Sequence, residues 1–88
     1  MDKPVSYYIE KLNKLEDKLY YKCRQISIDL VQNSIDELMQ YEEDPKRMPL
    51  DIVLGSLAYK ADTVLEVCDR ELKDYEIIFE LKRILEEK

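Results

Sequence analysis

Residues 44–49, with the sequence DPKRMP, form the one clear connector in this chain of 88 residues. Pro45 disfavours helical backbone at Asp44, and Pro49 does the same at Met48, because a proline ring crowds the residue before it. The connector therefore divides the chain into two long stretches, and each can be tested for helical periodicity.

The stretch before the connector contains neither glycine nor proline from Val5 to Asp44. Its apolar and semi-apolar residues recur at intervals of three and four, close to the helical repeat, at Val5, Tyr8, Leu12, Leu15, Leu19, Cys23, Ile26 and Leu30. This spacing predicts a helix over about residues 5–43. Ser27, Asn33 and Ser34 have weaker helix propensity, so a kink or break is expected near residues 27–34.

The stretch after the connector repeats the pattern with Leu50, Leu54, Leu57, Ala61, Val64, Cys68, Leu72, Tyr75 and Phe79. This spacing predicts a second helix over about residues 50–87. Gly55 costs about 1 kcal/mol relative to alanine inside a helix, which fits either a close approach by another backbone or a tolerated position near a helix end. Asp74 is a suitable N-cap for a separate last helix, so a break near residues 73–74 is the alternative.

These stretches predict a single all-α domain spanning residues 1–88, because one glycine and three prolines are too few for the turns of a many-stranded fold. Two long helices would form an antiparallel hairpin roughly 60 Å long. Apolar residues beyond one seam, such as Val31, Ile35, Ile77 and Ile78, need further cover. We expect two hairpins to pair as a dimeric four-helix bundle with coiled-coil packing; the alternative is a compact three- or four-helix monomer.

The charge balance opposes binding to nucleic acid or to an anionic membrane, because 14 Lys and Arg against 20 Asp and Glu give a net charge of -6. No apolar run is long enough to span a bilayer, and the amino-terminal residues lack the apolar core of a signal peptide. We therefore expect a cytoplasmic protein. Cys23 and Cys68 lie too far apart in sequence for a metal motif and are expected to be buried free thiols.

Charged residues flank the apolar stripes in two rows of opposite sign. The basic row on the first helix is Lys11, Lys14, Lys18 and Lys22, and the acidic row on the second is Asp62, Glu66, Asp69, Glu76 and Glu80. Flanking rows of this kind pair across a helix seam. We therefore interpret the lysines as an ion-pair row within a bundle. The alternative is a surface that contacts phosphate or nucleic acid with the help of the nearby Tyr7, Tyr8, Tyr20 and Tyr21, which the net charge opposes.

The sequence contains no histidine, which excludes catalytic triads and zinc sites that depend on it. Glu66 and Asp69 have an ExxD spacing that resembles the helical nucleotide pyrophosphohydrolases of the MazG type, a resemblance that implies Mg²⁺ held by Glu and Asp on paired helices. Their companion EExxE is absent, because Lys46 stands three residues after Glu43 and Gln40 stands three after Glu37. We predict no catalytic residues, no metal and no cofactor.

The sequence therefore predicts a small acidic helical module that binds another protein, of unknown identity, and has no enzymatic activity. The candidate interaction residues are Val31, Ile35, Leu38, Met39, Val53, Leu57, Glu42, Glu43 and Asp44. The alternative is an inhibitor or regulator whose acidic segment, residues 29–44, occupies a basic nucleic-acid-binding groove of a partner. A Mg²⁺-dependent nucleotide hydrolase is a remote third hypothesis.

Overall fold

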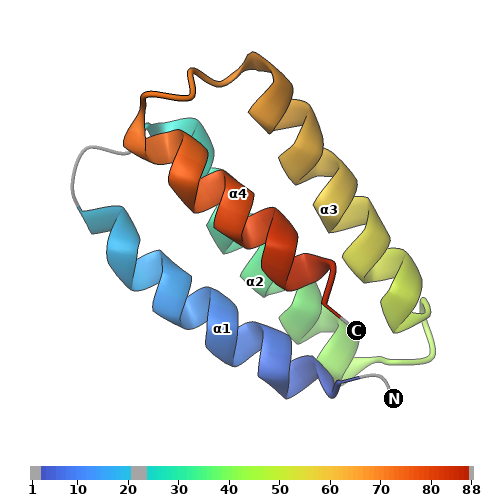
Figure 1. Ribbon diagram of the computed structural model, residues 1–88. Coiled ribbons are helices and arrows are strands. Elements are labelled where there is room, and N and C mark those ends of the chain that lie inside the picture. Colours follow the sequence, from blue (N-terminus) through green and yellow to red (C-terminus); the bar gives the residue numbers. More distant parts are fainter. Residues whose placement is uncertain (1–2, 21–23, 88) are drawn as a thin grey trace.

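The computed structural model describes residues 3–20 and 24–87, and in them the secondary structure is entirely helical. The elements are α1 (Val5–Asp17), a 3₁₀ turn (Lys18–Tyr20), α2 (Gln25–Glu43), α3 (Leu50–Val67) and α4 (Lys73–Leu85). Figure 1 shows four helices side by side, with successive helices running in opposite directions. The radius of gyration is 12.6 Å and the longest dimension is 39 Å, values of a compact bundle.

The expected hairpin of two long helices is wrong, because each long stretch is divided into two helices. The compact four-helix alternative fits instead. In the first half, α1 ends at Asp17 and α2 begins only at Gln25. The break therefore precedes the expected interval of residues 27–34, which lies wholly inside α2.

The serines that weaken helix propensity do not break α2, because the fold satisfies their hydroxyl groups. Ser34 Oγ donates a hydrogen bond to the Leu30 carbonyl at 2.8 Å, and Ser27 Oγ donates one to the Asp74 carboxylate at 2.7 Å. Both side chains are fully buried. A buried hydroxyl with a good partner costs a helix little, and the surrounding apolar contacts then decide the conformation.

The second half is divided close to the alternative position. Helix α3 ends at Val67, and α4 begins at Lys73 after an extended Cys68. The N-cap of α4 is Leu72, which makes no side-chain capping bond. Asp74, expected to cap α4, instead accepts hydrogen bonds at the start of α2, from the Arg24 backbone N–H at 2.9 Å and from Ser27.

The core draws side chains from all four helices. The buried apolar residues are Tyr8, Leu12, Leu15, Leu19, Leu30, Val31, Ile35, Leu38, Val53, Leu54, Leu57, Ala61, Ile77, Ile78, Leu81, Ile84 and Leu85. The surplus apolar side chains that suggested a dimer, including Val31, Ile35, Ile77 and Ile78, are thus covered within one chain. The helices of the same chain bury the side chains that a second hairpin was expected to bury.

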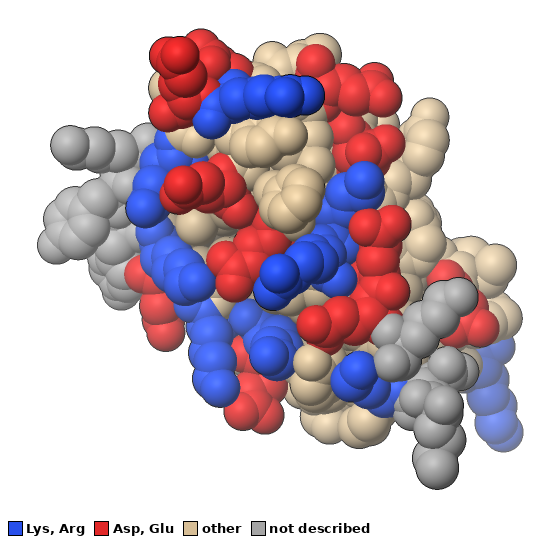
Figure 2. Space-filling model, viewed as in Figure 1, with Lys and Arg blue, Asp and Glu red and all other residues tan. Residues whose placement is uncertain are grey.

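One ion pair joins the two predicted charge rows: Lys18 Nζ lies 3.2 Å from a Glu80 carboxylate oxygen. Lys14 pairs with Glu10 on its own helix, and Lys11 lies over the Tyr7 ring. Figure 2 shows acidic and basic side chains interspersed over the face that α1 and α4 share. A continuous ladder between the rows is therefore not formed by the described residues.

The expectation of buried thiols is wrong for Cys68, which is half-buried at the end of α3. Its hydrogen-bond partner is a neighbouring carbonyl, that of Asp69. Cys23 lies outside the described residues, as does Lys22 of the basic row.

Candidate protein-binding surface

Helix α3 carries an exposed apolar face opposite the side that it packs into the core. Ile52, Tyr59 and Val67 are 56%, 73% and 83% exposed. They lie seven and eight residues apart, about two helical turns each, and therefore share one face. In Figure 2 the edge of the molecule that α3 forms is drawn largely in tan, the colour of uncharged residues. Exposed Ser56 and Thr63 lie between them on the same face, so the three side chains form a spaced apolar row and not a continuous patch. We take this row as a candidate contact surface.

Gly55 leaves a gap in α3 beside this face. A Cβ atom built at Gly55 meets no heavy atom within 4 Å, so nothing in the described fold requires a glycine there. The intramolecular close approach that the sequence suggested is therefore absent among the described residues. The helix nevertheless bears the propensity cost of about 1 kcal/mol.

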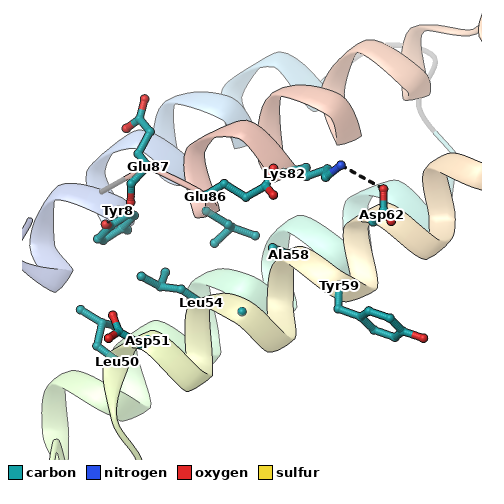
Figure 3. Close-up of a pocket in the computed structure, with 12 residues that line it drawn as sticks. Tyr8, Leu50, Asp51, Leu54, Ala58, Tyr59, Asp62, Lys82, Glu86 and Glu87 are labelled. Atoms are coloured by element: carbon teal, nitrogen blue, oxygen red, sulfur yellow. Dashed lines mark hydrogen bonds and ion pairs between the residues drawn. The ribbon is translucent and has the colours of Figure 1, made fainter. Parts of the chain in front are cut away.

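A groove of about 680 Å³ runs between α3 and α4 and includes Gly55 in its lining. Three of its lining residues are buried, Tyr8 of α1, Leu54 of α3 and Leu85 of α4. In Figure 3, Leu54 points toward α4, whereas Tyr59 points away to solvent at the outer edge. The complete lining is Tyr8, Leu50, Asp51, Leu54, Gly55, Ala58, Tyr59, Asp62, Lys82, Leu85, Glu86 and Glu87.

The groove is acidic, because its lining contains four carboxylates and one cation. That cation, Lys82, crosses from α4 to α3 and places its Nζ 3.0 Å from an Asp62 carboxylate oxygen (Figure 3). The hydrogen bond to Asp62 raises the pKa of Lys82 above 10.5, against a smaller opposing effect of burial. Asp51 and Glu86, on opposite walls, have no ion pair among the residues described.

Two tyrosines of α1 hold the chain that follows α4 at one end of the groove. Tyr8 donates a hydrogen bond to the Glu87 carbonyl at 2.6 Å, and Tyr7 donates one to the Glu87 carboxylate at 2.5 Å. The bond to Glu87, followed by burial and the negative charge of Glu87, raises the pKa of Tyr7 above 10.0. Together these bonds fix one edge of the groove.

The structure separates the predicted interaction residues into two groups. Five are buried in the core: Val31, Ile35, Leu38, Val53 and Leu57. The other four, Met39, Glu42, Glu43 and Asp44, are exposed at the end of α2. Of the nine residues, only Asp44 and Val53 line a small depression of about 140 Å³. Their role in binding stays a prediction.

The exposed apolar face of α3 was missed from sequence because the stronger apolar stripe on the same helix faces the core. A second signal was nevertheless present: Ile52, Tyr59 and Val67 lie about half a helical turn away from the stripe of Leu50, Leu57 and Ala61. A helix with apolar residues on two faces needs cover on two sides.

The carboxylates of the ExxD motif do not share a helix. Glu66 lies in the last turn of α3, whereas Asp69 follows the end of that helix and accepts a hydrogen bond from the Glu71 N–H. No group of three or more Cys, Asp and Glu residues in the described part of the chain is arranged to hold a metal ion.

The described helices also include none that is both long and apolar enough to cross a membrane. Comparisons with protein-family models, curated proteins and solved structures found no match to the chain.

Proposed function

We propose that this protein is a small cytoplasmic protein-interaction module, without enzymatic activity, that binds through α3. The observation that supports the proposal is the exposed apolar face of α3, which carries Ile52, Tyr59 and Val67. The other exposed large apolar side chains, Ile26, Met39, Met48 and Phe79, are distributed over α2, the connector and α4. Aromatic and aliphatic side chains at the centre of an interface contribute most of its binding energy. Two kinds of occupant fit this face, a second copy of the chain or a different protein.

A matched pair of substitutions tests the face. Ile52 and Ile26 are 56% and 55% exposed, and each lies in the first turn of its helix, Ile52 in α3 and Ile26 in α2. A photo-crosslinking residue at position 59 identifies bound protein in the source cell, and Ile52→Glu should abolish the crosslink while Ile26→Glu leaves it intact. Equal loss with both substitutions, or the same crosslinked species from exposed position 13 on α1, would contradict the proposal.

The homodimer is tested in the same variants by light scattering. A mass twice that of one chain, reduced to one chain by Ile52→Glu and unchanged by Ile26→Glu, would identify the second copy as the occupant. A mass of one chain in all three proteins leaves a different protein as the partner.

The acidic inhibitor is a second candidate, because Glu42, Glu43 and Asp44 are exposed together where α2 ends. Exposed carboxylates of this kind attract a basic groove on a partner. Replacing the three by their amides should then abolish binding of that basic partner, whereas Ile52→Glu should leave it intact. The nucleotide hydrolase is tested by melting the protein with and without millimolar Mg²⁺, since a bound ion raises the melting temperature.

A further inference from the structure

The groove between α3 and α4 has the length of a short helix. Its lining on α3 extends from Leu50 to Asp62, about 18 Å or three turns at 1.5 Å per residue. Gly55 leaves open space midway, so an incoming helix can approach the backbone of α3 there. Half-buried Leu50 and Ala58 add apolar surface beside it.

The charge of the groove selects a cationic occupant. Asp51 on the α3 wall and Glu86 on the α4 wall have no ion pair within 4 Å of any described residue; Lys82 is paired with Asp62 and attracts the Glu86 charge only at longer range. A ligand that brings Lys or Arg side chains between these walls would neutralise both carboxylates. A nucleic acid or an acidic peptide would be repelled.

The same charges disfavour a second copy of this chain. In an antiparallel pairing of α3 with α3, the same flank of each helix comes together. That flank carries Asp51 and Glu66, besides Asp62, which is paired with Lys82, and the two unpaired carboxylates would face those of the other copy. The exposed apolar face alone would have to overcome this repulsion.

We infer that the groove binds a basic amphipathic helix of a partner protein. Its apolar side chains lie over Gly55 and Ala58, and its Lys or Arg side chains face Asp51 and Glu86. The inference rests on the proposed function and names the chemistry of the partner, a helix laid in a groove between two helices.

The probe is a fluorescein-labelled 14-residue peptide of Leu and Lys in amphipathic helical order, titrated with the protein by fluorescence anisotropy. Two further peptides control for its properties. One has Glu at every Lys position and should not bind. The other has the same composition as the probe without a single apolar face and should bind about tenfold more weakly, because the apolar contact is lost.

Gly55→Leu fills the groove in a variant that should fold, since position 55 is exposed and a Cβ atom there meets no heavy atom within 4 Å. It should weaken probe binding about tenfold by steric exclusion. The matched control is Asn13→Leu, the same side chain at an exposed position of α1 that lies outside the groove and outside the exposed face of α3, which should bind like the parent. Equal binding by the two variants would overturn the inference.

The double substitution Asp51→Asn with Glu86→Gln tests whether the two wall carboxylates attract the basic probe. The double variant should bind the probe several-fold more weakly, whereas Asp17→Asn with Glu71→Gln, the same charge change at exposed positions outside the groove, should not. Equal weakening would mean attraction to net charge alone, which contradicts the inference. If no peptide binds but the crosslink from position 59 persists, the inference of a basic helix is rejected and the proposed function stands. If Ile52→Glu and Ile26→Glu affect that crosslink equally, the proposed function is rejected.

Discussion

Ser27 Oγ donates a hydrogen bond to the Asp74 carboxylate at 2.7 Å, and this buried contact joins the first turns of α2 and α4. The same carboxylate accepts the Arg24 N–H, a backbone donor that the first turn of α2 cannot satisfy internally. Asp74 is only 2% exposed. A residue of α4 therefore caps α2, which ties together the first turns of two helices that are not consecutive in the chain.

Replacing Asp74 with alanine should lower the free energy of unfolding by about 1–3 kcal/mol, because the Arg24 N–H and the Ser27 hydroxyl lose their buried acceptor. Ser27→Ala should cost about 1 kcal/mol, and the double variant less than the sum. Urea denaturation measures all three. Asp36→Ala, at an exposed position of α2, is the control; a variant at Asp74 as stable as this control would show that the bond contributes nothing.

Gly55→Ala should raise the free energy of unfolding by about 0.5–1 kcal/mol, because alanine has the better helix propensity and its Cβ meets open space. Chemical denaturation at two protein concentrations measures the gain. A loss of stability that depends on concentration would instead place another copy of the chain against Gly55.

Reversing the charge of Lys18 should destabilise the fold by about 0.2–1 kcal/mol at low salt, since Lys18 and Glu80 are both substantially exposed. Exchanging the two residues, Lys18→Glu with Glu80→Lys, should restore stability, and high salt should reduce the effect. Lys14→Glu is the control, because Lys14 pairs within α1 and should gain nothing from Glu80→Lys. Rescue of both variants by Glu80→Lys would mean that the whole lysine row faces α4.

The free energy of unfolding should fall at high pH because Tyr7 ionises there. The hydrogen bond to Glu87 raises the pKa of Tyr7 above 10.0. The folded state holds the phenolic proton more tightly than the unfolded chain does. The contribution of this hydrogen bond to the free energy of unfolding is thus present below pH 10 and is lost as the pH rises through the folded-state pKa of Tyr7. Tyrosine ¹³Cζ NMR measures the titration, with Tyr7→Phe to assign the signal; Glu87→Gln should move the pKa back down, and an unmoved pKa would exclude this cause.

Periodicity and proline placement predicted the helical class and the connector at 44–49 because both depend on local sequence. They could not place the breaks, which depend on tertiary contacts. Ser27 and Ser34 have weak propensity but lie inside α2, because Asp74 and the Leu30 carbonyl satisfy their hydroxyl groups. The acceptor at Asp74 comes from 47 residues away, and no local pattern shows it.

The candidate surface was predicted less well than the fold for a related reason. An apolar stripe does not show whether it will be covered by the same chain or by another. Val31 and Leu57 were assigned to an interface and are core residues, whereas Ile52 and Tyr59 were not assigned and are exposed. The groove itself requires the walls of α3 and α4 to be placed together.

The order of the helices has a consequence for how quickly the chain folds. Because α1 packs beside α2 and α3 beside α4 (Figure 1), many contacts join residues close in sequence, and helical chains of this kind fold in microseconds to milliseconds. The Ser27–Asp74 bond joins the two pairs and closes a long loop, so we expect it to form after the transition state. Asp74→Ala should then accelerate unfolding in a stopped-flow or temperature-jump experiment and leave the refolding rate almost unchanged. A slowed refolding rate would mean that the two helical pairs dock before either is complete.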